Sequence, residues 1–175
     1  NDYDKTGQRI GEHRFLGLFT AKAFQEDPAL IPLIGEKLAQ IIEQTGLDKT
    51  SHDYKQLKRI ISTLPREDLF RVNTEELFKT ITGILHIKER PRLKLFIHSD
   101  PFKLFVSCII YALRDCYSTE MRIKFQTILC KVFESTEINF STQFSESILV
   151  QVHIVLKVSP DKPIDVSTAD IERRL

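Results

Sequence analysis

Hydrophobic residues in the first half of the chain recur every three or four positions, which is the spacing of an amphipathic helix. Residues that start or stop helices separate three such stripes: Pro32 and Gly46 bracket the first, Pro65 ends the second, and Asn73 can cap the third. The apolar positions are Ile34, Leu38, Ile41 and Ile42, then Leu57, Ile60, Ile61 and Leu64, then Leu77, Ile81, Ile84 and Leu85. The pattern predicts a three-helix segment over residues 21–90.

Past the third helix the pattern changes to the two-residue alternation of strands. Two pairs of strands are each followed by a helix, and the short links within each pair suit hairpins. In the last strand Val152 and Ile154 belong to an apolar even-numbered face, which we expect to be the dry face of a sheet. Gln151 and His153 fall on the wetter face, so His153 is expected at the surface and Gln151 is expected to tolerate substitution by Asp. Residues 91–175 are therefore predicted to form a two-layer α+β sandwich with a four-stranded, mainly antiparallel sheet, in the order strand-strand-helix-strand-strand-helix.

The N-terminal region carries one further strand pattern. The stretch "RFLGLFT", Arg14–Thr20, predicts a short strand with Phe15 and Phe19 on one side. No hairpin partner lies near it, so residues 1–20 are expected to be an edge strand or the tail of a preceding domain. The chain starts without Met and stops soon after a final helix begins, which we interpret as a piece of a longer polypeptide.

Charge and composition exclude several classes of function. The 25 basic and 24 acidic side chains leave a formal charge of +1, which gives no basic footprint for nucleic acid or for an anionic membrane. No apolar run approaches the roughly 20 residues that span a bilayer. Three scattered cysteines, Cys108, Cys116 and Cys130, suit reduced thiols in a cytoplasmic protein.

Residue types that perform catalysis are present, but not in catalytic arrangements. His98, Ser99 and Asp100 stand side by side, yet neighbouring side chains of an extended turn diverge, and Asp100 before Pro101 predicts a turn. The five histidines and three cysteines show no metal-ligand spacing, and none of the six glycines forms a phosphate-binding loop. We therefore predict no catalytic, cofactor-binding or metal-binding residue in this chain.

One part of the wetter face is unusually apolar. Phe105, Ile109 and Tyr111 follow one another on the odd-numbered side of the second predicted strand, alternating with Lys103 and Ser107. Exposed apolar strips usually mark contacts, so these three residues are the candidate interface. Two alternatives remain: the upstream helices fold back over this strip, or it docks against another module or subunit.

Four stretches resemble one family in the same order and at similar separations. They are "EHRFLGLFT", "SHDYKQLKRIISTLPREDLF", "GILHIKERPRLKLFIHSDPFKLFVSCIIYALRDCYSTEMR" and "FSTQFSESILVQVHIVLKV". They resemble the N-terminal, non-catalytic region of the large bacterial NAD-specific glutamate dehydrogenases, over residues 12–175. The resemblance implies an ACT-like sandwich for residues 91–175. It also implies a parent chain that oxidatively deaminates L-glutamate to 2-oxoglutarate with NAD, and whose catalytic lysine and dinucleotide loop lie far downstream. Neither has a counterpart here, so no catalytic residue is carried over.

The resemblance leads to two hypotheses of function. The first is a regulatory and assembly module, inactive when isolated, whose partners are the other domains and subunits of a homo-oligomeric cytoplasmic enzyme. The second is an ACT-like domain that senses an amino-acid effector. No glycine follows Gly83, so the glycine-rich bend common in amino-acid-binding ACT domains is missing. This favours the first hypothesis.

Overall fold

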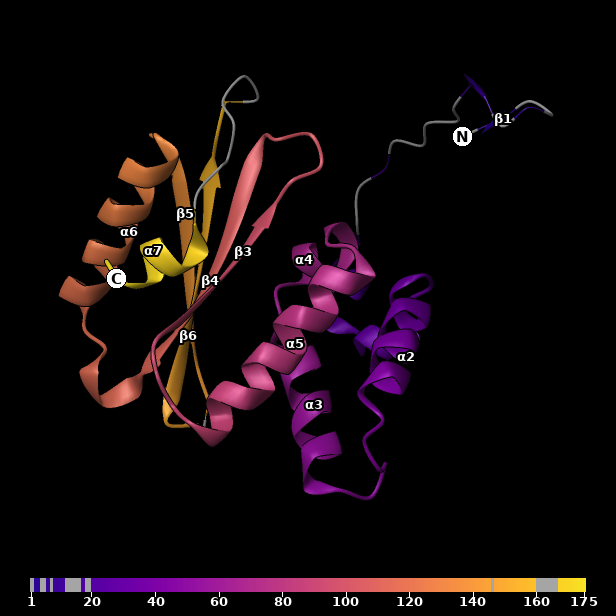
Figure 1. Ribbon diagram of the computed structural model, residues 1–175, viewed down its shortest axis with the longest axis horizontal. Helices are drawn as coiled ribbons and strands as arrows, with labels where there is room; N and C mark the ends of the chain where they lie inside the picture. The colour runs from indigo at the N-terminus through magenta and orange to yellow at the C-terminus, as the bar shows by residue number, and fades with distance from the viewer. Residues whose placement is uncertain are drawn as a thin grey trace.

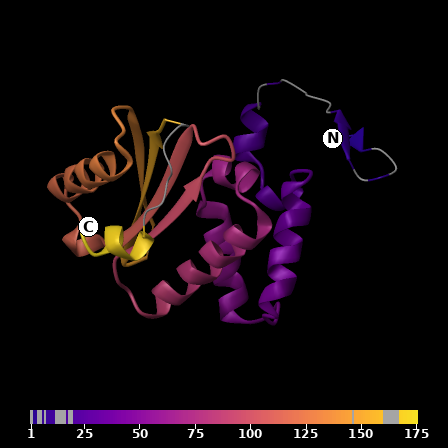
Figure 2. The ribbon, with the colours of Figure 1, turned by 45° about the horizontal axis from the view of Figure 1, so that its top comes forward.

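The computed structural model describes residues 2–3, 6, 8–11, 17, 20–145, 147–159 and 167–175. A small hairpin of β1 (Asp2–Tyr3) and β2 (Arg9–Gly11) stands apart from the body of the molecule (Figure 1, Figure 2). The strand expected over residues 14–20 lies outside the described residues, apart from Gly17 and Thr20, which are not in a strand.

The helical segment contains the three expected helices and some shorter ones. Its elements are α1 (Ala21–Gln25), the 3-10 helix η1 (Pro28–Leu30), α2 (Ile34–Thr45), α3 (His52–Thr63), α4 (Arg66–Arg71) and α5 (Thr74–Glu89). Gly46 ends α2 in the left-handed conformation, with a φ of 63°. The side chain of Ser51 accepts a hydrogen bond from the backbone of Tyr54 at 3.1 Å, and that of Asn73 accepts one from Glu76 at 2.9 Å. Side-chain caps therefore fix the starts of α3 and α5.

The sequence pattern did not predict α4. Pro65 follows the end of α3, as expected, but it also stands immediately before the first turn of α4. A proline is tolerated there because the first backbone N–H groups of a helix have no partner within it. Glu67 and Asp68 occupy that first turn, where acidic side chains are favoured by the helix dipole.

The second half forms a four-stranded sheet with helices on one face. Its elements are β3 (Lys94–Ser99), β4 (Phe105–Leu113), the 3-10 helix η2 (Arg114–Cys116), α6 (Thr119–Phe133), β5 (Ile138–Phe144), β6 (Leu149–Lys157) and α7 (Thr168–Glu172). The strand order is β3-β4-β6-β5, and all neighbours are antiparallel. The predicted α+β class and the predicted order of elements are confirmed.

The sheet is covered on both faces, so the body has three layers rather than the two expected for the sheet region alone (Figure 1). The face that carries the even-numbered residues of β4 and β6 packs against α6 and α7, as the dry face was predicted to do. Its core includes Leu95, Val106, Cys108, Ile110, Phe125, Leu129, Val152, Ile154 and Ile171. The opposite face contributes Ile109, Tyr111 and Leu149 to the core of the helical segment.

Candidate functional site

The seam is the contact surface between the helical segment and the sheet. It buries both apolar and polar side chains. Its apolar part buries Ile109, which is fully inaccessible, and Tyr111, which is 5% exposed. The ring of Phe96 on β3 meets Tyr111 edge to face, with centroids 6.3 Å apart. A Cβ added to Gly83 of α5 would lie 2.7 Å from the Phe96 ring, so the absence of a side chain there allows the helix to approach the sheet closely.

The candidate interface was expected either to be covered by the upstream helices or to dock against another module or subunit. The structure supports the first alternative for two of its three residues. Ile109 and Tyr111 are covered by helices of the same chain, so they are not available to another module or subunit. Phe105 differs, because it lies at the start of β4 and remains 37% exposed. The interface predicted for Phe105, Ile109 and Tyr111 therefore needs correction: the last two residues form an internal contact.

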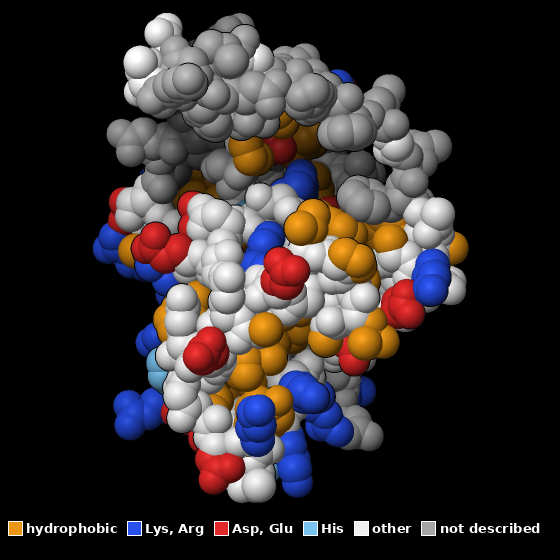
Figure 3. Space-filling model, turned by 90° about the vertical axis from the view of Figure 1, so that its right-hand side faces the viewer, with side chains coloured by type: hydrophobic (Ala, Val, Ile, Leu, Met, Phe, Trp, Pro, Cys, Tyr) orange, Lys and Arg blue, Asp and Glu red, His pale blue; other side chains and the backbone are white. Residues whose placement is uncertain are grey.

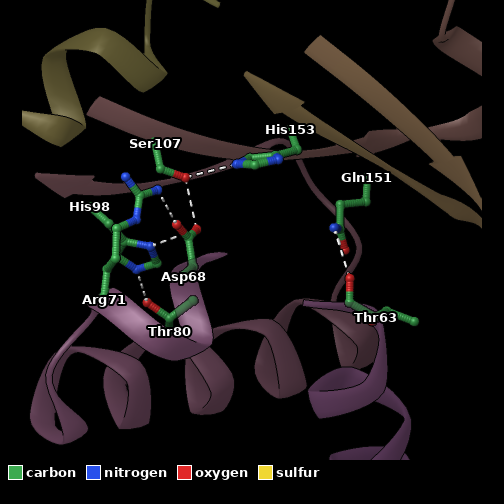
Figure 4. Close-up of polar contacts among 8 residues, drawn as sticks. All are labelled: Thr63, Asp68, Arg71, Thr80, His98, Ser107, Gln151 and His153. Atoms are coloured by element: carbon green, nitrogen blue, oxygen red, sulfur yellow. Dashed lines mark hydrogen bonds and ion pairs between the residues drawn. The ribbon is translucent and has the colours of Figure 1, made fainter. Parts of the chain in front are cut away.

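A buried polar network lies next to the apolar part of the seam (Figure 4). At its centre is the carboxylate of Asp68 on α4, which is 1% exposed. It accepts a hydrogen bond from the Ser107 hydroxyl on β4 at 2.8 Å and contacts the His98 ring on β3 at 3.2 Å. Arg71, one turn along α4, donates to Asp68 at 3.2 Å. A single side chain of α4 therefore holds two strands of the sheet.

Two further residues extend the network. The Thr80 hydroxyl on α5 lies 2.8 Å from His98 Nε2, so α5 is also tied to β3. His153 on β6 lies with Nε2 2.9 Å from the Ser107 hydroxyl oxygen. Because Ser107 gives its only proton to Asp68, this contact requires that His153 carry its proton on Nε2 and donate it. The network thus joins two helices to three strands.

The network keeps the Asp68 carboxylate ionised. Burial raises the pKa of Asp68, but the hydrogen bond and charge of His98, the hydrogen bond from Ser107 and the charge of His153 together outweigh burial, and the pKa lies below its ordinary value. A buried charge with these partners is stable, whereas the same charge without them would be costly. The network therefore depends on all its members being present.

The residue types of a Ser-His-Asp triad occur here, but their connections differ from those of a triad. In a triad the carboxylate holds the histidine that activates the serine. Asp68 instead binds Ser107 and His98, and Ser107 is only 2% exposed. The row of His98, Ser99 and Asp100 does not have the connections of a triad either, because His98 contacts Thr80 and Asp68. Asp100 accepts a hydrogen bond from the backbone of Phe102 at 3.0 Å, as the predicted turn requires. The arrangement supports a structural role for the network.

The expected surface position of Gln151 is wrong, and His153, on the same face, is half-buried rather than exposed. Gln151 is 7% exposed; it accepts a hydrogen bond from the Tyr111 hydroxyl at 2.6 Å and donates one to the Thr63 carbonyl at 3.1 Å. A carboxylate in its place would have no proton to donate to Thr63, so we expect Gln151→Asp to destabilise the seam. Both residues lie on the face that was expected to be wet, but the helices cover that face.

Sequence reasoning missed the network because its centre lies on the unpredicted helix α4. Some signal was nevertheless present. His98 and Ser107 are polar interruptions in apolar strands, and they are direct cross-strand partners in the β3–β4 hairpin. A predicted register would have placed them side by side, although nothing in the sequence pairs them with Asp68.

Acidification is expected to weaken the fold partly through His153. Burial lowers the pKa of His153 from 6.5, and the attraction of Asp68 and Glu67 does not cancel that effect. The unfolded chain therefore takes up a proton at this residue at a higher pH than the folded chain. Stability should fall as the pH drops through about 6.5, and further at lower pH as Asp68, whose pKa is also lowered, takes up a proton.

Urea unfolding between about pH 7.5 and 5.5 should show a shallower decline in the free energy of unfolding for His153→Gln than for the parent chain. An equal decline in the variant and the parent chain would contradict this assignment.

A groove of 680 Å³ opens beside the network, between α4 and the outer face of β4, β6 and β5. Phe24, Phe70 and Phe105 contribute to an apolar wall, and Glu67 and Arg71 add opposite charges. The buried Nε of Arg71 has no hydrogen-bond partner within the described part of the chain. The groove is therefore amphipathic.

Other kinds of site find no support in the part of the chain that the structure describes. No group of histidine, cysteine and acidic residues there could hold a metal ion. No helix among the described residues is both long and apolar enough to cross a membrane. Burial raises the pKa of the Cys108 thiol well above its usual range, which makes it a poor nucleophile.

Two family models match the chain and together cover most of it. The model described as "Glutamate dehydrogenase, helical motif 1" matches residues 31–90, and the one described as "Glutamate dehydrogenase, ACT2 domain" matches residues 94–175. The chain belongs to the glutamate dehydrogenase family. The seam is therefore the contact between helical motif 1 and the ACT2 domain.

The relatives agree with these matches. The chain is 40% identical over 173 residues to the NAD-specific glutamate dehydrogenase of Halomonas elongata, and 38% identical over 174 residues to that of Pseudomonas aeruginosa. It is 30% identical over 170 residues to that of Mycobacterium tuberculosis. These alignments cover 99%, 99% and 92% of this chain, but 11%, 11% and 10% of the relatives. The chain thus spans about a tenth of the length of these curated relatives. The resemblance to the N-terminal region of the large NAD-specific glutamate dehydrogenases is confirmed.

Proposed function

We propose that this chain is a regulatory and assembly segment of a large, cytoplasmic NAD-dependent glutamate dehydrogenase. In the parent enzyme, L-glutamate, NAD and water become 2-oxoglutarate, ammonia and NADH. NAD is then a cofactor of the parent and not of this segment, which is inactive when isolated. Its partners are the other domains and the subunits of the same homo-oligomeric enzyme.

The seam is the observation that carries the proposal. Its buried apolar contacts and the Asp68 network fix helical motif 1 against the ACT2 sheet, so the two modules behave as one body. A displacement imposed on either module is then passed to the other, which suits a part that positions domains. The polar residues of the seam are consumed in holding the modules together, which suits a part without chemistry of its own.

The contact with the rest of the enzyme is proposed at the β3–β4 turn. Phe102, Leu104 and Phe105 are 78%, 44% and 37% exposed, and together they place three large apolar side chains at one end of the sheet. On the helical side, by contrast, apolar side chains reach the surface between acidic and basic ones (Figure 3). About nine-tenths of the length of the relatives lies outside this chain, which leaves ample surface to cover the turn. The proposed partner of this apolar turn is another domain or subunit of the same enzyme.

The proposal is tested in the full-length enzyme with Phe102→Ser and Leu104→Ser combined. Both side chains are exposed, so the segment should stay folded, while mass photometry should show a loss of the assembled oligomer or kinetics a loss of regulation. Ile123→Ser is the matched control, because Ile123 is 50% exposed on α6 and away from the turn. Unchanged assembly and unchanged kinetics in the double variant would contradict the proposed contact.

The second function, sensing of an amino-acid effector, is favoured by the groove beside the network. Glu67 and Arg71 could face the two charges of a zwitterion, and Phe24, Phe70 and Phe105 its apolar side chain. A thermal-shift screen of the 175-residue chain with amino acids tests this function, because a ligand of the folded state raises the melting temperature. A shift that Glu67→Gln abolishes would support it, and the absence of any shift would exclude it.

A further inference from the structure

A second groove, of 610 Å³, lies at the other end of the seam. Its helical side is formed by α3 and the C-terminal end of α5. Its sheet side is formed by β4, the start of β6, and Ser145 and Ser147 of the β5–β6 turn. That turn and the end of α5 come together at the lower end of the sheet (Figure 1). Thr63 and Gln151, which bridge the seam, line this groove as well as the first (Figure 4).

The described residues that line the second groove give it a positive charge. Arg59 of α3 and Lys88 of α5 line it, and no acidic residue in the described part of the chain does so; Glu146 of the turn lies outside that part. Among the described residues, the ammonium group of Lys88 donates only to the neutral Gln56 side chain, at 3.2 Å. The guanidinium group of Arg59 makes no hydrogen bond or ion pair with a described residue. Burial, followed by the charge of Arg59, lowers the pKa of Lys88. The two cations on the helical side of the groove thus repel each other.

The opposite wall of the groove offers neutral donors. The hydroxyl oxygens of Ser145 and Ser147 accept hydrogen bonds from the backbone N–H groups of Ser147 and Leu149, each at 3.2 Å. Their hydroxyl protons are therefore not used in these contacts and can be donated to a ligand. A small group that accepts hydrogen bonds and carries negative charge would meet donors on both walls.

We propose that the second groove binds a small oxyanion, a carboxylate or phosphate group, between Arg59 and Lys88 of helical motif 1 and the β5–β6 turn of the ACT2 domain. The planar guanidinium group of arginine matches the geometry of carboxylate and phosphate groups, and the anion would offset the repulsion between the two cations. Bound there, it would tie the two modules together at the end of the seam farthest from the Asp68 network. The inference rests on the proposed function in one respect: the bound anion would be a ligand through which the segment is regulated.

Calorimetric titration of the 175-residue chain tests the proposal. Inorganic phosphate and succinate are titrated separately, each against sodium chloride at equal ionic strength, so that general screening is removed. We expect saturable binding of at least one of them. Arg59→Gln and Lys88→Met should each weaken it by roughly 10- to 100-fold, the equivalent of one charge-assisted hydrogen bond. Lys124→Gln, which removes one positive charge on exposed α6, should leave the affinity unchanged.

A second readout separates binding from folding. Without oxyanion, Lys88→Met should melt at the same temperature as the parent chain or higher, because the change removes a repelled, partly buried cation. With oxyanion, the parent chain should gain more than the variant. Binding of phosphate alone, of succinate alone or of both supports the site and identifies the group it prefers. No saturable binding, or equal binding by the Arg59 and Lys88 variants, overturns it. Neither result bears on assembly of the full-length enzyme, which the proposed β3–β4 contact tests separately.

Discussion

Replacing Ile109 with alanine is expected to lower the free energy of unfolding by about 2–5 kcal/mol. Ile109 is fully buried where the sheet meets the helical segment, so the change removes apolar contacts and leaves a cavity in the core of the seam. Urea denaturation followed by circular dichroism gives the loss directly, from the shift in midpoint at constant slope.

Ile123→Ala is the matched control for this prediction. It removes the same atoms from a residue that is 50% exposed on α6, and its effect should stay within roughly 0.5 kcal/mol. If Ile109→Ala cost no more than Ile123→Ala, Ile109 would face solvent. The candidate interface would then be an external surface after all.

Asp68→Ala is expected to cost about 3–5 kcal/mol, the usual effect of removing one partner from a buried ion pair. The change leaves the Ser107 hydroxyl and the His98 ring without their acceptor in the seam, and it removes the partner of Arg71. Unsatisfied buried donors pay their full desolvation penalty, so the loss should exceed that of an ordinary hydrogen bond. Differential scanning calorimetry should show a markedly lower melting temperature.

Glu67→Ala provides the comparison on the same helix. Glu67 is exposed in the first turn of α4. There the interaction of its charge with the helix dipole stabilises the fold by about 0.3–1 kcal/mol at most. Equal costs for Glu67→Ala and Asp68→Ala would show that Asp68 acts only through the dipole of α4. The network would then not hold the seam.

Local patterns were sufficient to predict most elements of the fold. The cap at Asn73 and the left-handed end at Gly46 are short-range signals, and each marks a helix end in the structure. The alternation in the last strand is also a local signal, because successive side chains of a strand point to opposite faces. It identified the buried face that carries Val152 and Ile154.

The packing of one half of the chain on the other could not be predicted in this way. Burial of the odd-numbered face depends on where the helical segment lies, and no local pattern encodes that position. Gln151 was therefore assigned to the surface, although the helices cover it, and His153 was assigned there although it is half-buried. The Asp68 network could not be predicted for the same reason. Its members are up to 85 positions apart and meet only after the seam has formed.

Native-state hydrogen exchange of the 175-residue chain tests most directly whether helical motif 1 and the ACT2 sheet form one body. Increasing urea, below the unfolding transition, gives an opening free energy and its denaturant dependence for each amide. If the seam joins the modules, the most protected amides of α5 and of β4 should share one opening free energy and one slope, equal to those of global unfolding. If α5 instead opens at a clearly lower free energy and with a smaller slope than β4, helical motif 1 unfolds on its own, and the claim of a single body is contradicted.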